Sequence, residues 1–117
     1  MIDTGTLVID RERYRVTVEG RAIHLTYMEF TALWTIVEQA GRVVTYEQLS
    51  AALWGDTLPA ASRRLAVVIS RVRAKLGRAA DRIDTVRRVG YRLANDSSGA
   101  SLSSSRERDA VPTSMKR

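Results

Sequence analysis

Arginine is the residue type in this sequence that most clearly points to a function, and about half of the arginines lie in one stretch. Residues 62–94 hold nine arginines and one lysine against Asp81 and Asp84, which gives +8 within a chain of net charge +6. Guanidinium groups bind phosphates and guanine edges through paired hydrogen bonds. Such a concentration of positive charge in a small domain favours a surface that binds a polyanion, although a solvated arginine-rich helix would give the same count.

The residues that most other chemistries need are missing from the 117-residue sequence. Cysteine is absent and His24 is the one histidine, which leaves too few ligands for a zinc site and no thiol nucleophile. The sequence also lacks a nucleophile–base pair and a glycine-rich phosphate loop. We therefore expect no enzyme, no metal and no cofactor. Because no apolar run approaches the roughly 20 residues that span a bilayer, and no secretory signal opens the chain, we expect a soluble, cytoplasmic protein.

Three short runs near the N-terminus alternate between apolar and polar residues as β-strands do, at 7–9, 14–18 and 22–25. In the second run, Tyr14, Val16 and Val18 are expected to point to one side of the strand, and the residues between them to the other. The Glu19-Gly20 pair predicts a tight turn into the third run, in which His24 faces outward. These runs predict a small antiparallel sheet.

Two capping boxes predict the starts of the next two helices. Thr26 with Glu29, and Thr45 with Gln48, have the spacing in which each threonine and its partner satisfy free N–H groups of the first helical turn. The first predicted helix carries an apolar stripe at positions 30, 33, 34, 37 and 40 and ends before Gly41. The second helix is short and ends before Gly55.

A third helix is predicted from Arg63 to Leu76, capped by Ser62. Its helical wheel places residues 65, 69, 72 and 76 on one apolar side, with 68 at the margin, and residues 63, 64, 67, 70, 71 and 74 on the opposite side. The helix has no acidic residue, so an anion must offset the repulsion between its arginines. The major groove of B-DNA fits such a helix, and Val67 would then contact a thymine methyl group. RNA and an acidic protein are the alternatives, although the A-form major groove is too narrow for a helix.

Two short runs within residues 83–93, broken at positions 87–90, predict a hairpin with a basic tip. Two helices followed by such a hairpin form the layout of a winged helix-turn-helix. We therefore expect an α+β fold with a small N-terminal antiparallel sheet, three helices and a C-terminal β-hairpin wing, all within residues 1–94. Residues 95–117 begin with a serine-rich stretch and are expected to be a disordered tail.

From Leu7 to Leu93 the chain resembles the DNA-binding effector domain of OmpR/PhoB-type response regulators, a family of bacterial transcription factors in two-component signalling. The motifs that carry this resemblance are Leu25-Thr-x-x-Glu-Phe30, Gly41-x-Val43-x-Thr45, Leu49-x-x-x-Leu53-Trp54-Gly55, Arg71-x-Arg73-x-Lys75-Leu76 and Thr85-Val-Arg-x-x-Gly-Tyr-Arg92. No receiver domain precedes this region, so the resemblance implies an excised effector domain or a free-standing regulator.

The resemblance implies a role for particular side chains. Arg64, Val67 and Arg71 match positions that read bases in the major groove, and Arg87 matches the wing arginine that enters the adjacent minor groove. Contacts with the DNA backbone are implied for Trp54, Arg63, Arg73, Thr85 and Tyr91. For Trp54 and Tyr91 a place in the core is an equal alternative.

The resemblance also implies partners. The expected function is sequence-specific binding of double-stranded DNA, with weak monomers that pair head to tail on direct repeats. The loop at residues 55–61 matches a loop that is implicated in contacting RNA polymerase. A protein-interaction module that uses this loop is therefore the alternative function.

Overall fold

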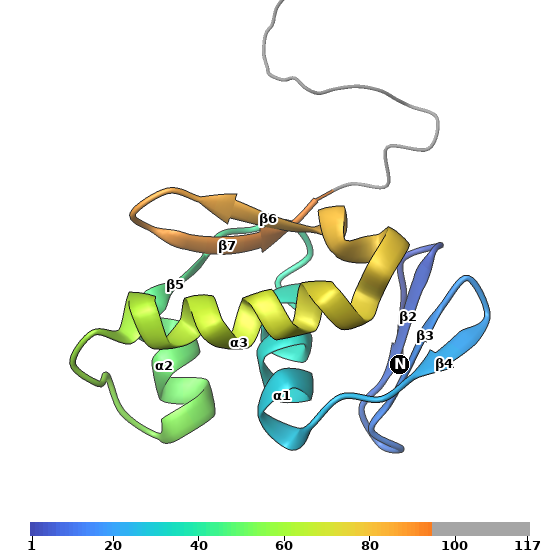
Figure 1. Ribbon diagram of the computed structural model, residues 1–117, viewed down its shortest axis with the longest axis horizontal. Coiled ribbons are helices and arrows are strands. Elements are labelled where there is room, and N and C mark those ends of the chain that lie inside the picture. The colour runs from blue at the N-terminus through green and yellow to red at the C-terminus, as the bar shows by residue number, and fades with distance from the viewer. Residues whose placement is uncertain (95–117) are drawn as a thin grey trace, which may run out of the picture.

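The computed structural model describes residues 1–94, which form two small antiparallel sheets and three packed helices (Figure 1). The α+β arrangement expected from the sequence is confirmed, with the second sheet containing the hairpin wing. The interval 95–117, expected to be a disordered tail, lies outside the described residues. Within residues 1–94, none of the helices has the length and apolar character needed to cross a membrane.

The N-terminal sheet follows the chain in order from β1 to β4 and is antiparallel throughout. Its strands are β1 (Ile2–Asp3), β2 (Leu7–Asp10), β3 (Arg15–Val18) and β4 (Arg21–Ile23). Val16 and Val18 are buried together, as the alternation predicted, whereas Tyr14 is exposed. Tyr14 precedes β3 with a left-handed backbone (φ 50°) and is exposed, and its ring instead lies 4.9 Å from that of Phe30. His24 is exposed, as expected.

Both predicted capping boxes are confirmed. In α1 (Tyr27–Val37), the Thr26 hydroxyl accepts a hydrogen bond from the Glu29 N–H at 3.2 Å, and the Glu29 carboxylate accepts one from the Thr26 N–H at 2.9 Å. The Thr45–Gln48 pair repeats this arrangement at the start of α2 (Tyr46–Trp54), which ends at Gly55 as predicted. However, α1 ends three residues before Ala40. Ala40 and the following glycine both have positive φ, which reverses the chain toward the second sheet.

The long helix α3 (Ala61–Leu76) begins two residues earlier than predicted. Ser62 lies inside the helix, so its predicted capping role is wrong. The N-cap is Ala60, which has φ 58° and whose carbonyl accepts hydrogen bonds from the N–H groups of Arg63 and Arg64. After α3 an unpredicted 3₁₀ helix, η1 (Gly77–Arg82), leads the chain back to the second sheet.

The second sheet contains the wing. Its strands are β5 (Val44–Thr45), β6 (Ile83–Val86) and β7 (Gly90–Leu93), in the order β5-β7-β6. Val44 lies opposite Tyr91 and Thr45 opposite Gly90, while β6 and β7 form the hairpin itself. The short strand β5 therefore joins the wing to the start of α2.

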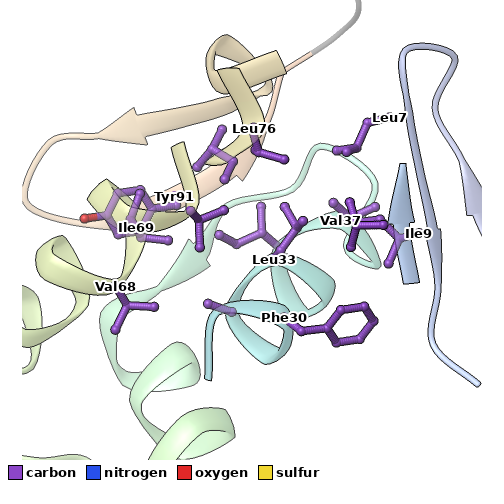
Figure 2. Close-up of a cluster of buried hydrophobic side chains, with 14 of the residues drawn as sticks. Leu7, Ile9, Phe30, Leu33, Val37, Val68, Ile69, Leu76 and Tyr91 are labelled. Atoms are coloured by element: carbon purple, nitrogen blue, oxygen red, sulfur yellow. The ribbon is translucent and has the colours of Figure 1, made fainter. Parts of the chain in front are cut away.

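The core fixes how α3 is rotated. Side chains from α1, α3, β2 and β7 meet in one apolar cluster (Figure 2). Each fully buried aliphatic side chain there contributes about 1.5–3 kcal/mol to stability. The α3 residues that are buried are those the helical wheel predicted: Leu65, Val68, Ile69, Val72 and Leu76. Of the α1 stripe, Trp34 is only half-buried and Ala40 is exposed.

Candidate nucleic-acid interface

The side of α3 opposite the core is an open surface, which we call the α3 face. Its members are all exposed: Arg63, Arg64, Val67, Ser70, Arg71 and Ala74. Val67 is 48% exposed, so an apolar side chain lies among the arginines of this face. The wheel prediction for these residues is confirmed, because the buried side chains leave α3 no other rotation.

Several basic residues of 62–94 are neutralised within the domain. The ion pairs are Lys75 with Glu29 at 2.7 Å, Arg78 with Glu19 at 3.4 Å and Arg92 with Asp84 at 3.0 Å. Arg82 is buried and donates to the carbonyls of Ala94 and Thr4 at 2.9 and 3.2 Å. These four cations are therefore already engaged by groups of the domain itself.

The remaining arginines have no carboxylate partner within residues 1–94. They are Arg63, Arg64, Arg71, Arg73, Arg87 and Arg88. Arg64 makes one hydrogen bond, from its Nε to the carbonyl of Pro59 at 3.3 Å. Apart from Arg73, all lie exposed on the α3 face or at the wing tip. The first turns of α3 and the turn between β6 and β7 lie on the same side of the domain (Figure 1). The unpaired positive charge of residues 62–94 is therefore concentrated on one side.

Arg73 links α3 to the wing. Its Nη2 donates to the carbonyl of Ile83 at 2.6 Å and to the hydroxyl of Thr85 at 2.8 Å. Its guanidinium also lies 5.8 Å from the centroid of the Tyr91 ring, within reach of a cation–π interaction. Because the Thr85 oxygen accepts from Arg73, the hydroxyl hydrogen is left to donate elsewhere. Sequence reasoning missed this link because its partners lie 10 and 12 residues away.

Tyr91 and Trp54, for which core and surface were equal alternatives, lie at the edge of the core. Tyr91 is 5% exposed, with its ring in an edge-to-face contact with Tyr46 and its oxygen directed away from the labelled core residues (Figure 2). Burial, together with Tyr46, raises the pKa of the Tyr91 hydroxyl more than Arg73 lowers it. The hydroxyl is therefore a neutral donor at physiological pH. Trp54 is half-buried and packs against the core at the end of α2.

The turn of the wing is held against the start of α2. The Val89 N–H donates to the Val86 carbonyl at 3.0 Å and closes the turn, while the Tyr46 N–H donates to the Val89 carbonyl at 3.0 Å. The first residue of α2 thus fixes the direction in which the wing projects. Arg87 and Arg88, inside the turn, are exposed.

The loop between α2 and α3 is stabilised by hydrogen bonds to a buried residue that the sequence analysis did not single out. The hydroxyl of Ser50, which is completely buried, donates to the Asp56 carbonyl at 2.7 Å and accepts from the Leu58 N–H at 3.1 Å. Asp56 and Pro59 are exposed. The loop at 55–61 is therefore an ordered, protruding surface. Among residues 1–94, no three His, Cys, Asp or Glu side chains group together as metal ligands.

Comparisons with known proteins agree with this geometry. The family described as "Transcriptional regulatory protein, C terminal" matches residues 20–93. The response regulator ArlR of Staphylococcus saprophyticus is 35% identical over 95 residues, covering 78% of this chain and 42% of ArlR. The sensory transduction protein RegX3 of Mycobacterium leprae is 36% identical over 98 residues, covering 80% of this chain and 48% of RegX3. The chain thus spans a little under half the length of these relatives.

A solved structure shares both fold and sequence with the chain. It is the RstA DNA-binding domain of Klebsiella pneumoniae in complex with the RstA box, with a TM-score of 0.72 and 35% identity. The match covers 80% of this chain and 95% of that domain.

Proposed function

The chain belongs to the family of C-terminal domains of transcriptional regulatory proteins, and on this premise we propose that it binds double-stranded DNA in a sequence-specific manner to regulate transcription. The observation that carries the proposal is the α3 face. Three arginines on it have no carboxylate partner within residues 1–94, and a half-exposed valine lies among them. A helix of this width fits the major groove, where arginine reads guanine and an apolar side chain meets the thymine methyl group. We assign base contacts to Arg64, Val67 and Arg71.

The wing supplies the second contact. Its tip lies on the same side of the domain as the first turns of α3 (Figure 1), so α3 in the major groove directs Arg87 toward the adjacent minor groove. An arginine there distinguishes A·T-rich from G·C-rich flanks through the width and potential of the groove.

Contacts with the DNA backbone are assigned to Arg63, Arg73, Thr85, Trp54 and Tyr91. The geometry around Thr85 supports this assignment, because Arg73 donates to its hydroxyl oxygen and leaves the hydroxyl hydrogen for a phosphate oxygen. The neutral Tyr91 hydroxyl is likewise a donor. Phosphate contacts of this kind set register without reading sequence.

Assembly and recruitment follow from the same premise. We propose that weakly associating monomers pair head to tail on direct repeats in the bacterial cytoplasm. The loop at 55–61 is proposed to contact RNA polymerase, because Ser50 holds it in an ordered conformation with Asp56 exposed. The interaction-module function is thereby a part of the regulator function.

Selection of bound sequences from random duplexes, followed by footprinting, tests the proposed function directly. On the selected duplex, Arg71→Ala should weaken binding by about 1–3 kcal/mol and relax the preference at one base pair. Arg63→Ala should weaken binding to all sequences alike. Arg21→Ala, an exposed arginine on β4, is the charge-matched control and should change neither. Equal, sequence-independent losses for Arg71→Ala and Arg63→Ala would reduce the α3 face to a general electrostatic patch.

A further inference from the structure

The wing tip contains a backbone conformation that its sequence disfavours. The hydrogen bond from the Val89 N–H to the Val86 carbonyl closes a tight turn in which Arg88 is the third residue, and Arg88 has φ 67°. A positive φ at this position of a turn normally calls for glycine, because the Cβ of any other residue crowds the following carbonyl. Arg88 therefore holds a strained conformation.

The other non-glycine residues with a left-handed backbone can be compared with Arg88 by the contacts that their side chains make. Non-glycine residues with positive φ within 1–94 are Tyr14, Glu19, Ala40, Ala60 and Arg88. Tyr14 packs on the Phe30 ring, and Glu19 pairs with Arg78. The alanines have no side chain beyond Cβ. Among residues 1–94, Arg88 is thus the one long side chain of this group without a hydrogen bond, ion pair or ring contact to another described residue.

An unrelieved strain of this kind is a reason to look for a partner outside the domain. Arg88 is exposed at the tip of the wing, next to Arg87 in the chain. The third arginine of the hairpin, Arg92, is neutralised by Asp84. The two arginines of the tip are therefore the wing's unpaired charges within the described part of the chain.

We propose that Arg88 is a second DNA contact of the wing, and that its guanidinium binds a phosphodiester at the edge of the minor groove that Arg87 enters. The inference rests on the proposed DNA-binding function. A minor groove has a phosphate backbone along each side, and consecutive side chains of a tight turn diverge. One arginine can therefore point into the groove while its neighbour reaches the backbone. A planar guanidinium also suits the two oxygens of a phosphodiester.

The proposal predicts opposite effects on folding and on binding. Arg88→Gly and Arg88→Asn both accept the left-handed conformation and both remove the charge. Each variant should unfold at a temperature equal to or a few degrees above that of the wild type. Each should bind DNA more weakly, by the same factor for the selected duplex and for its point-substituted derivatives. A residue that only shapes the turn would not lower affinity when its strain is relieved.

Salt dependence counts the lost phosphate contact. The slope of log affinity against log salt should be shallower by about 0.9 in both variants, because each phosphate contact contributes that amount. The loss relative to wild type should therefore shrink about threefold between 50 and 200 mM salt. Arg88→Lys keeps the charge and should keep the slope. Arg21→Ala, which removes one exposed charge from the opposite sheet, should keep both slope and affinity.

The outcomes separate this inference from the function on which it rests. If the wild-type chain selects no duplex sequence, the proposed function fails. If it does select one, but Arg88→Gly and Arg88→Asn bind with unchanged affinity and slope, the function stands and the contact assigned to Arg88 is wrong. A loss confined to certain sequences would also overturn the proposal, because it would make Arg88 a base reader.

Discussion

Replacing Gly90 with alanine isolates the contact that attaches the wing to the rest of the domain. A Cβ at this position would lie 1.9 Å from the Val44 carbonyl oxygen and 2.9 Å from the Thr45 Cα, both of which are backbone atoms. The φ of Gly90 is not in the left-handed range, so the alanine backbone itself is unstrained. The cost is therefore purely steric. Ordinary contact begins near 3.4 Å, so β5 would have to move away by about 1.5 Å, which breaks its pairing with β7.

The size of the effect follows from what this movement breaks. About two ladder hydrogen bonds at 0.5–1.5 kcal/mol each are lost, and repacking around buried Val44 adds about 1–3 kcal/mol. We expect the free energy of unfolding to fall by about 2–5 kcal/mol and the melting temperature by at least about 8 °C. Urea unfolding followed by circular dichroism measures both the loss and its cooperativity.

Gly20→Ala is the matched control for this experiment. Gly20 has φ +81° with no atom within 4 Å of a built Cβ, so alanine there meets backbone strain without a clash and should cost about 1 kcal/mol. In DNA binding, the Gly90→Ala wing should lose its preference for an A·T-rich flank, while Gly20→Ala should keep it. If Gly90→Ala is no less stable than Gly20→Ala, the argument that β5 and β7 approach too closely for a side chain is refuted.

Three further predictions concern the polar contacts of the domain. Burial would raise the pKa of Glu29, but hydrogen bonds and charge from Lys75 and the Thr26 backbone outweigh it and lower the pKa below its ordinary value of 4.5. Glu29 therefore stabilises the fold above about pH 4.5, and this contribution is lost as the pH falls through the lowered pKa. The urea midpoints of wild type and Glu29→Gln should converge at acidic pH, and a constant difference would contradict the assignment. Arg82→Lys should lower the free energy of unfolding by about 1–3 kcal/mol in urea titrations, since one ammonium cannot reach both of its carbonyl partners, and an unchanged midpoint would contradict this. In a double-mutant cycle of DNA affinity, Arg73→Ala and Thr85→Ala should show a coupling of at least about 0.5 kcal/mol, whereas additive losses would mean that the two residues act separately.

Local signals in the sequence predicted the parts of the fold whose causes are local. Each capping box holds its threonine and its partner within four residues, so the starts of α1 and α2 are readable from the chain. The start of α3 could not be predicted in this way, because its N-cap is Ala60. Ala60 has a left-handed backbone and no side-chain capping hydrogen bond, so its residue type gives no signal. The early end of α1 has the same origin, as Ala40 adopts a positive φ that alanine does not predict. A two-residue strand such as β1 carries no periodicity.

In the candidate site, too, the features with local causes could be predicted and those that depend on tertiary contacts could not. The helical period of 3.6 residues fixes which side of α3 is apolar, so its exposed arginines could be predicted. What the sequence could not show is which cations are already occupied. Lys75 is neutralised by Glu29, which lies 46 residues earlier, and Arg73 is turned toward the wing. Such pairings depend on tertiary proximity, which charge counting along the chain does not contain.

The buried guanidinium of Arg82 has a consequence for how the chain connectivity of this domain can be changed. It bonds at once to Thr4, in the connection after β1, and to Ala94, just past β7, and so links the segment after the first strand to the segment after the last one. Ends held together in this way suit circular permutation: a linker from residue 94 to residue 1 would join two segments that Arg82 already connects, and new termini could open in the surface loop at 55–61. The same link favours inserting residues 1–94 into an exposed loop of a host protein, because Arg82 would hold the two connections to the host together through residues 4 and 94.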